Sequence, residues 1–331
     1  MKIFIALSVL IICISACNQQ NDQTAYDSIL KEPPFDALTD SINREKNNDA
    51  LYYRRGLKLK EANYTEPALA DFNKAWSLNK REEYAVHISS ILLDKKPDSA
   101  QVFLESALRI IPSVFFELQL AEAYILQNKN DEALKVYDEI LKKEPRQIDA
   151  LMKRSALLEE KGQSAASLAS LEKAYELAPF DVEISYALAY KYAENNNPKA
   201  IALSDSLIRM DSSASHAEPY YFKGVYYANT GNKEKALQLF NQAIQHDYNF
   251  FDAHMEKGVI YFDEGKLDEA YKTFELVITI SPSYANAYYW IGKIQEKQGL
   301  LKEAKLNYQR SYGLDKTLTQ AKQAANKIKT N

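Results

Sequence analysis

Three consecutive segments of equal length decide the fold: residues 217–250 (AEPYYFKGVYYANTGNKEKALQLFNQAIQHDYNF), 251–284 (FDAHMEKGVIYFDEGKLDEAYKTFELVITISPSY) and 285–318 (ANAYYWIGKIQEKQGLLKEAKLNYQRSYGLDKTL). They repeat with a period of 34 residues and without gaps. Small residues at fixed offsets mark places where two helices approach closely, and large aromatic residues fill the space between helix pairs. The residues in register are Gly224, Gly258 and Gly292; Gly231, Gly265 and Gly299; Ala236, Ala270 and Ala304; and Phe240, Phe274 and Tyr308.

The pattern resembles the tetratricopeptide repeat, a helix-turn-helix unit of this length. The first helix of that unit carries an aromatic residue, a small residue and Tyr, and the second carries Ala, an aromatic residue and Ala. In the copy that begins at Ala217, these are Tyr220, Gly224, Tyr227, Ala236, Phe240 and Ala243. The resemblance implies an all-α fold, an α-solenoid in which the repeats wind into a right-handed superhelix and the first helices form its concave wall.

About eight copies can be placed by their small and aromatic positions, so the repeat array is predicted over residues 49–318. The second copy is degenerate, because Ile88 replaces the small residue and Lys95-Lys96-Pro97 replaces the usual turn. A final helix within 319–331 is predicted to cap the stack. The expected repeats are 49–80, 81–113, 114–147, 148–181, 182–216, 217–250, 251–284 and 285–318.

The fifth copy is irregular. It lacks a residue near Asn195-Asn196-Asn197-Pro198 and gains several residues at 211–216. We therefore expect a bend or discontinuity between the two halves of the array at this copy.

The amino terminus has the pattern of a signal peptide over residues 1–16. Lys2 is followed by an apolar run, residues 3–14, that is too short to span a bilayer. Ile14-Ser15-Ala16-Cys17 resembles the bacterial lipobox, which implies cleavage before Cys17 and acylation of its thiol, with palmitate as an expected modification. The alternative is an ordinary secretory signal with Cys17 incidental. Residues 17–48 are then the lipidated Cys and a flexible tether, with a short helix as an option at 37–44, where Phe35 and Leu38 could dock on the first repeat.

Composition narrows the class of protein. The net charge of −4 becomes −5 when Lys2 leaves with the signal peptide, which argues against a nucleic-acid binder. The charged and hydrophobic fractions are those of an ordinary folded chain. The resemblance to the lipobox implies a protein of the bacterial cell envelope, anchored by lipid to the outer membrane or the cell membrane on its periplasmic or surface side.

Groove-facing positions follow from the resemblance by offset along each copy. One position carries a series of Tyr, Met and Leu, and the position three residues earlier carries mostly carboxylates. Aromatic and Met side chains supply interface energy, and carboxylates steer basic partners. The predicted partner-binding residues are Tyr53, Leu118, Met152, Tyr186, Tyr190, Tyr221, Met255 and Tyr289, with Glu82, Asp149, Glu183, Glu218 and Asp252.

These tyrosines have two interpretations. They bind a partner, or they pack against the next repeat, and contiguity on an exposed face would distinguish the two. The subclass of the family that grips the carboxyl-terminal tails of chaperones needs Lys and Asn at repeated groove positions. Tyr, Met and Leu occupy the Lys position here, so that use is not expected.

Catalysis has little support in the sequence. H-E-x-x-H, G-x-S-x-G and a glycine-rich phosphate loop are all missing. His246, Asp247, Asp252 and His254 lie close in sequence around one turn, but His254 takes a position where Tyr220 and Tyr288 pack. We therefore expect no enzyme activity, no metal site and no cofactor.

The leading hypothesis is a membrane-anchored scaffold or adaptor lipoprotein that binds a basic or apolar partner protein or peptide in its concave groove. The alternative is a carbohydrate-binding surface lipoprotein, because tyrosines and carboxylates also suit sugar rings. Two stacked tyrosines on an exposed face would favour the glycan, and a continuous groove of peptide width would favour the polypeptide.

Overall fold

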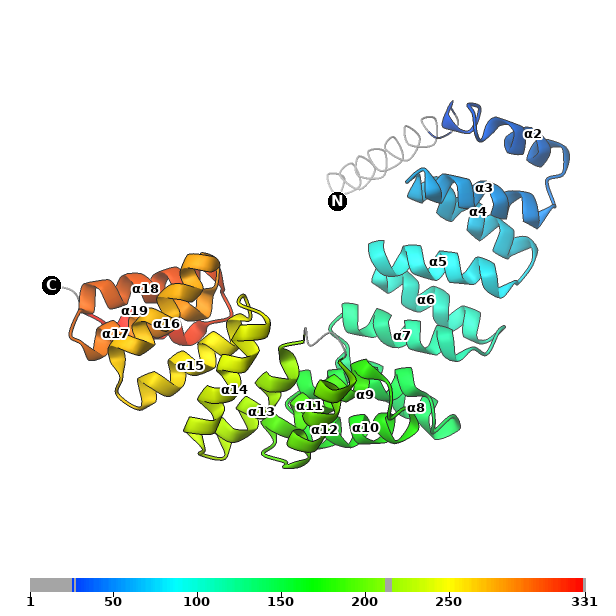
Figure 1. Cartoon of the computed structure of the whole chain (residues 1–331). Coiled ribbons are helices and arrows are strands. Elements are labelled where there is room, and N and C mark those ends of the chain that lie inside the picture. Colours follow the sequence, from blue (N-terminus) through cyan, green and yellow to red (C-terminus); the bar gives the residue numbers. More distant parts are fainter. Residues whose placement is uncertain (1–25, 27, 212–215, 330–331) are drawn as a thin grey trace, which may run out of the picture. The chain divides into compact units, whose positions relative to one another are not determined.

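The computed structural model describes residues 26, 28–211 and 216–329. The predicted signal peptide and Cys17 lie outside the described residues. Within them the chain forms eighteen α-helices and no strand, which confirms the predicted all-α solenoid (Figure 1). The chain divides into two compact units, of which unit 1 ends at Leu157 and unit 2 begins at Leu158.

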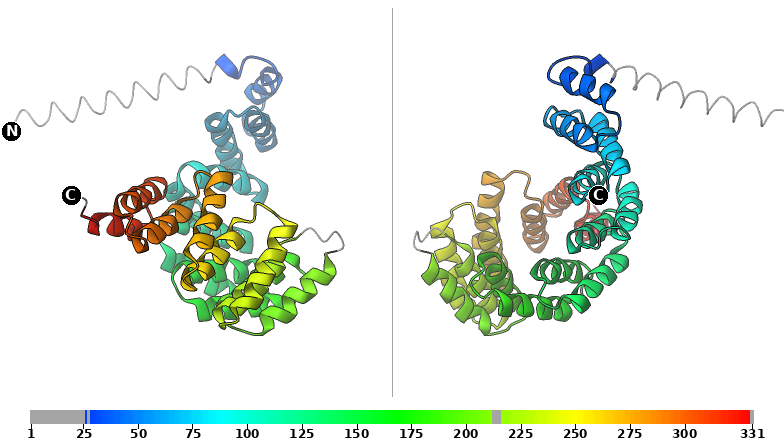
Figure 2. Two further views of the ribbon diagram at one scale, coloured as in Figure 1. Left: turned by 60° about the vertical axis from the view of Figure 1, so that its left-hand side comes forward. Right: turned by 90° about the vertical axis from the view of Figure 1, so that its right-hand side faces the viewer.

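Unit 1 consists of a short leading helix followed by helix pairs. Consecutive helices lie side by side, as the views in Figures 1 and 2 both show. Its helices are α2 (Asp36–Arg44), α3 (Asp49–Glu61), α4 (Thr65–Leu78), α5 (Glu82–Lys95), α6 (Pro97–Leu108), α7 (Val114–Leu126), α8 (Asn130–Lys143) and most of α9 (Ile148–Glu160).

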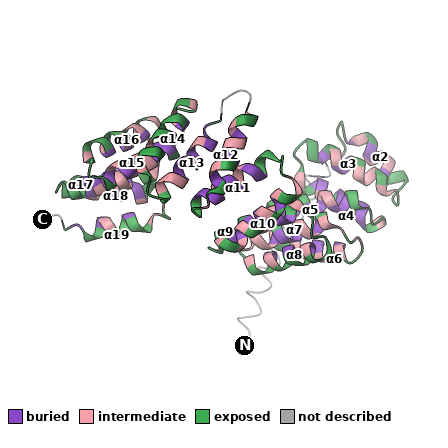
Figure 3. Cartoon of the chain, turned by 60° about the horizontal axis from the view of Figure 1, so that its bottom comes forward, coloured by how far each residue is buried: buried purple, intermediate pink, exposed green. Residues whose placement is uncertain are grey.

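Unit 2 continues the same alternation of first and second helices and ends on a shorter helix. Figure 3 shows buried and exposed residues on different sides of the individual helices, as expected where each helix buries one face against its neighbours. Its helices are α10 (Ser164–Leu177), α11 (Val182–Glu194), α12 (Lys199–Met210), α13 (Glu218–Asn229), α14 (Lys233–His246), α15 (Phe251–Asp263), α16 (Leu267–Ile280), α17 (Ala285–Lys297), α18 (Leu301–Leu314) and α19 (Thr319–Lys327).

A glycine on the first helix and an aromatic ring on the second helix fix the close approach within a repeat. A Cβ atom added to Gly292 would lie 2.8 Å from two ring atoms of Tyr308 and 3.2 Å from the carbonyl oxygen of Ala304. The ring therefore occupies the space that any larger residue would need. The same arrangement holds in three other repeats, at Gly56 with Phe72, Gly224 with Phe240, and Gly258 with Phe274.

The degenerate second repeat keeps the same packing, but the larger side chain is on its first helix and the smaller replaces the ring on its second helix. Ile88 takes the place of the small residue on α5, and Leu104 takes the place of the aromatic ring on α6. Both side chains are fully buried in one hydrophobic cluster. A larger residue on one helix is thus offset by a smaller one on the other, as volume-conserving changes in a core require.

The turn inside each repeat explains the second glycine series. Gly231, Gly265 and Gly299 have φ angles of 89°, 76° and 78°, a region that side chains with a Cβ rarely adopt. In the first and third repeats Asn63 and Asn128 adopt the same left-handed conformation, with φ of 63° and 59°. Asn tolerates this region better than other residues, so the turn geometry survives without glycine.

The predicted tether is ordered near the first repeat. Residues 36–44 form α2, and Phe35 and Leu38 are only 3% and 8% exposed, packed where the sequence allowed them to dock. Arg55 of α3 links this helix to the repeat, because its guanidinium donates to the Thr39 hydroxyl at 2.9 Å. The short helix that the sequence allowed at 37–44 is therefore confirmed, and residues 35–44 are not part of a flexible tether.

The compact units do not divide near residues 195–216, where the sequence led us to expect a bend or discontinuity. The boundary between the compact units falls within α9, whereas α13 packs directly on both α11 and α12. The reason is aromatic packing across the irregular repeat: the ring of Tyr186 on α11 lies 5.9 Å from that of Phe222 on α13. Extra loop residues do not prevent two helices from sharing a core when large side chains bridge them.

The last helix, α19, covers the end of unit 2. Ala321 and Ala325 of this helix and Ile328 directly after it are buried, and the last two join a cluster with Ala304 and Tyr308 of α18. The opposite side of α19 is exposed and rich in lysine. Over the described ranges, every helix is too short or too polar to cross a lipid bilayer.

Candidate functional site

The predicted groove residues of unit 2 lie on its first helices, α11, α13, α15 and α17. The aromatic rings of α11 and α13 form a continuous row. Tyr190 faces Tyr221 with 6.3 Å between ring centroids and 18° between planes, and it also contacts Phe222 at 5.5 Å. Tyr221 contacts Phe250 at 5.1 Å. The row therefore runs from one repeat into the next.

Burial separates these residues into two roles. Tyr221 and Met255 are each only 8% exposed, and both pack in the core of the unit. Tyr186, Tyr190 and Tyr289 are half-buried and reach the surface. Packing against the next repeat therefore accounts for Tyr221 and Met255, and three tyrosines of unit 2 stay available for contact with a partner.

In unit 1 the predicted residues are less clearly arranged as a surface. Tyr53 packs on Tyr84 at 4.8 Å and on Phe72 at 5.9 Å, and its hydroxyl lies 3.3 Å from Nε2 of His87. Leu118 packs against the cluster around Tyr137. Met152 is half-buried. These side chains mainly fill space between neighbouring repeats of unit 1.

The predicted carboxylates lie close to solvent. Glu82, Asp149, Glu183 and Asp252 are exposed, and Glu218 is half-buried. Two of them accept hydrogen bonds from the last residue of their own repeat: Glu82 from the Ser113 hydroxyl at 3.0 Å and Asp252 from the Tyr284 hydroxyl at 2.9 Å. Asp252 is therefore held beside the aromatic row of unit 2.

Glu256, which is not among the groove residues predicted from the sequence, lies at the centre of this arrangement. It is half-buried on α15, and among the described residues nothing donates a hydrogen bond or forms an ion pair to it. Burial, with a smaller contribution from the negative charge of Asp252, raises the pKa of its carboxyl group. A desolvated carboxylate without a partner is energetically costly, so a cation at this point would be stabilised.

The negative charges of Glu256 and Asp252 also affect the pKa values of the neighbouring tyrosines. Burial is the main cause that raises the pKa of Tyr190, Tyr221 and Tyr284, and the charges of Glu256 and Asp252 raise it further. These phenols are neutral at physiological pH and act as hydrogen-bond donors and ring surfaces. We call Tyr190, Tyr284, Asp252 and Glu256 the tyrosine-carboxylate surface; Tyr221 is buried beneath it.

A signal for Glu256 exists in the repeat register. The equivalent residues of the neighbouring copies are Phe222 and Trp290, both aromatic. Burying a charged side chain where the neighbouring repeats carry aromatic rings costs free energy of folding. Residues that are kept in spite of such a cost are often functional.

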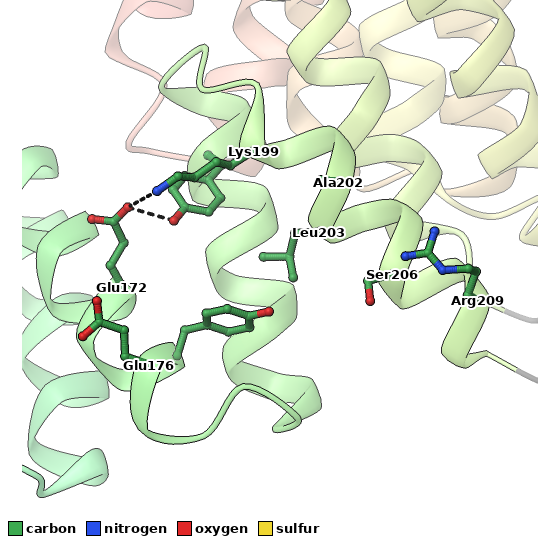
Figure 4. Close-up of a pocket in the computed structure, with 9 residues that line it drawn as sticks. Glu172, Glu176, Lys199, Ala202, Leu203, Ser206 and Arg209 are labelled. Carbon is green, nitrogen blue, oxygen red and sulfur yellow. Dashed lines mark hydrogen bonds and ion pairs between the residues drawn. The ribbon is translucent and has the colours of Figure 1, made fainter.

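A second depression, of about 530 Å³, lies between α10, α11 and α12 (Figure 4). Its lining contains two carboxylates and two cations, and one pair of them is joined within the protein. The Glu172 carboxylate accepts a hydrogen bond from the Tyr192 hydroxyl at 2.8 Å and lies 3.4 Å from the Lys199 ammonium. The charges of this pocket therefore balance in number, whereas the tyrosine-carboxylate surface carries two carboxylates.

His246 and His254, which the sequence places around one turn, both pack against neighbouring residues of the protein. His246 stacks on Tyr220 at 4.6 Å, and Nε2 of the buried His254 lies 3.0 Å from the carbonyl oxygen of Tyr248. Burial lowers the pKa of His254. Within the described residues, no group of three or more His, Cys, Asp or Glu side chains converges as metal ligands would.

Comparison with known proteins agrees with the geometry of the repeats. Models of the TPR repeat match residues 258–299, and models of the tetratricopeptide repeat match residues 118–182, 217–250 and 285–318. No curated protein matches the chain.

Solved structures show the same fold. A tetratricopeptide repeat protein from Parabacteroides merdae is 22% identical, with a TM-score of 0.65 over 74% of this chain and 97% of that chain. The Cut9-Hcn1 hetero-tetramer of the APC/C is 13% identical, with a TM-score of 0.51 over 90% of this chain and 60% of that chain.

The fold and its repeats define an all-α repeat protein that presents surfaces to other proteins. The chain is a member of the tetratricopeptide repeat family. Repeats of this family act as scaffolds for protein-protein interaction, and the family is non-catalytic.

Proposed function

We propose that this protein is a lipid-anchored scaffold of the bacterial cell envelope, and that its tyrosine-carboxylate surface binds a basic segment of a partner polypeptide. The observation that carries the proposal is Glu256, a half-buried carboxylate to which no group of the described residues donates a hydrogen bond or forms an ion pair. A Lys or Arg side chain from the partner supplies the missing counter-charge. Charge-assisted hydrogen bonds to such a carboxylate are among the stronger polar contacts in proteins.

The aromatic part of the surface supports the same partner. The Tyr190 ring lies at the surface beside Glu256, and an Arg or Lys stem can lie along this ring while its charged end reaches the carboxylate. Asp252 adds a second negative charge, already oriented by the Tyr284 hydroxyl. Rigid tyrosines lose little conformational entropy on binding, which favours them at interfaces.

A polypeptide suits this surface better than a sugar. The predicted glycan site needs two tyrosine rings that are free on an exposed face. Tyr190 and Tyr221 are stacked, but they face each other, and Tyr221 is only 8% exposed. A sugar ring would therefore find one partly exposed ring rather than two.

The anchor part of the proposal rests on the amino-terminal sequence. Lys2, the apolar residues 3–14 and Cys17 form the pattern that resembles a lipoprotein signal. Two or more acyl chains hold a protein on a membrane stably without a spanning helix.

The test is affinity purification of the tagged full-length chain from its native membranes in mild detergent. A Tyr190→Ser, Glu256→Gln variant removes the ring and the charge, and we expect it to lose most of the partner that the unchanged chain retains. Tyr248→Ser with Glu234→Gln is the matched control, because Tyr248 is 58% exposed and Glu234 lies on the second helix α14. Equal recovery of partners by both variants would contradict the proposed surface.

A further inference from the structure

The end of unit 2 contains a pocket of the opposite charge. It has a volume of about 670 Å³ and lies among α15, α17, α18 and α19. Its wall combines three lysines, one glutamate, two glutamines and an apolar and aromatic part. The lining residues are Phe262, Tyr289, Lys293, Glu296, Lys297, Tyr308, Gln320, Gln323, Ala324 and Lys327.

Aromatic rings position two of the lysines. The ammonium of Lys293 lies 4.0 Å from the centroid of Trp290 and 5.0 Å from that of Phe262. The ammonium of Lys297 lies 4.2 Å from the same Phe262 ring. Cation-π contacts at these distances restrict the long side chains, so that their charges are held at the pocket before a ligand arrives.

The positive charge of this pocket is not neutralised within the described part of the chain. There, no carboxylate forms an ion pair with Lys293, Lys297 or Lys327. Glu296, the one acid in the wall, accepts a hydrogen bond from the Tyr308 hydroxyl at 2.6 Å. Three ammonium groups therefore face a single carboxylate, and the pocket attracts an anion.

The remaining wall indicates which anion fits. Gln320 and Gln323 come from the beginning of α19, and in the described structure neither side chain has a hydrogen-bond partner, so their amide groups are free to donate. Tyr289 and Ala324, both half-buried, contribute an apolar side that a small inorganic anion cannot use. A chain that carries carboxylates next to an apolar side chain uses both parts of the wall.

We propose that this pocket binds an acidic segment of a polypeptide, with its Asp or Glu carboxylates on Lys293, Lys297 and Lys327. The proposal rests on the proposed scaffold function, because it assigns a second recognition element to the same molecule. It adds a requirement on the partner: a basic segment for the tyrosine-carboxylate surface and an acidic, partly apolar segment for this pocket.

Trp290 provides the probe. The chain has two tryptophans, so Trp76→Phe leaves Trp290, in contact with Lys293, as the sole reporter of the pocket. The full-length chain in detergent is titrated with N-acetylated peptides of phenylalanine followed by glutamates, as the free acid and as the carboxyl-terminal amide. We expect a saturable change in Trp290 emission with both peptides, since side-chain carboxylates suffice, and an affinity that falls as salt is raised.

Two variants with equal charge change make the test specific. Lys297→Gln with Lys327→Gln removes two charges from the pocket, and we expect at least tenfold weaker binding. Lys302→Gln with Lys322→Gln removes two exposed charges elsewhere on α18 and α19 and should leave the affinity unchanged. Binding of only the free-acid peptide would overturn the side-chain assignment in favour of a chain terminus.

The proposal is also overturned by equal affinity of the two variants, by equally tight binding of a glutamine peptide, or by no emission change up to millimolar peptide. Competition by inorganic phosphate as strong as that by the glutamate peptide would identify a simple anion site instead. The partner purification described above is independent of this titration. If the titration fails while the purification still depends on Tyr190 and Glu256, this inference alone is wrong. If the purification result fails while the titration succeeds, the proposed function is wrong.

Discussion

Gly258 lies directly against the ring of Phe274, so close that a Cβ atom on Gly258 would overlap the ring. Gly258→Ala should therefore push α15 and α16 apart and lower the stability of unit 2 by about 1–3 kcal/mol. Thermal unfolding followed by circular dichroism measures this change. Gly313→Ala is the control, because no atom lies within 4 Å of an added Cβ there, and it should be neutral or slightly stabilising. A Phe274→Leu change that rescues Gly258→Ala would support the steric cause; equal effects at Gly258 and Gly313 would contradict it.

A buried ion pair joins α3 and α4. Nε of Arg55 donates to Oδ2 of Asp71 at 2.7 Å and Nη2 donates to Oδ1 at 2.8 Å, with both residues buried. Burial raises the pKa of Asp71, and the Arg55 guanidinium opposes that shift. Asp71→Asn should cost about 3–5 kcal/mol, because it leaves a buried guanidinium without its counter-charge.

The exposed pair of Arg154 with Asp138, at 2.8 Å, is the control for this experiment. Asp138→Asn should change the unfolding midpoint little, since exposed pairs contribute little. If urea unfolding gives both variants the same midpoint, the Arg55 pair does not stabilise unit 1 as described.

Stability should decrease in mild acid through His87. Its ring stacks on Phe72 at 4.8 Å, and Nδ1 lies 3.5 Å from the Lys60 ammonium. Burial and then the Lys60 charge lower the pKa of His87, against a smaller opposing effect of Glu83. The folded chain thus binds fewer protons than the unfolded chain below the ordinary histidine value of about 6.5, so unfolding becomes easier as the pH falls through that range.

Unfolding midpoints measured between neutral pH and mild acid test this prediction. His87→Gln should flatten the dependence, and addition of His254→Gln should flatten it further, since burial also lowers the pKa of His254. His216→Gln, at an exposed position, is the composition control. A pH dependence that is the same in all variants would exclude His87 as its source.

The lipid anchor predicts different behaviour of the two cysteines. Cys17→Ser should release the protein from the membrane fraction and abolish labelling by an alkyne analogue of palmitate, because the thiol is the expected acylation site. Cys13→Ser lies in the apolar part of the predicted signal and should keep both. Retention and labelling of Cys17→Ser would contradict the lipoprotein assignment.

The repeat register predicted the helix pairs because it reports local packing. Gly224 and Phe240 recur where a helix pair needs contact between backbone and ring, and the structure places them there. The sequence predicted only half of the change in the second repeat: it showed that Ile88 is larger than the residue expected there, but not that Leu104, smaller than the usual ring, packs in the same cluster. Which two residues pack together depends on the tertiary structure, and the repeat register alone does not give it.

The candidate site was predicted less completely. Offsets identified Tyr190 and Asp252, but the same offsets selected Tyr221 and Met255, which the neighbouring repeat buries. Glu256 fell outside the chosen positions. The lysine pocket depends on α19 closing against α17 and α18, a tertiary arrangement that no repeat position encodes.

The most direct test of the account replaces Tyr190 with a photo-reactive phenylalanine analogue in cells and irradiates them before extraction. The same analogue at Leu306, which is 63% exposed on the second helix α18, samples the other face of a repeat. We expect a discrete cross-linked partner at position 190 that is lost with Glu256→Gln, and none at position 306. Cross-links at position 306 alone, or at neither position in cells that contain the anchored protein, would contradict it.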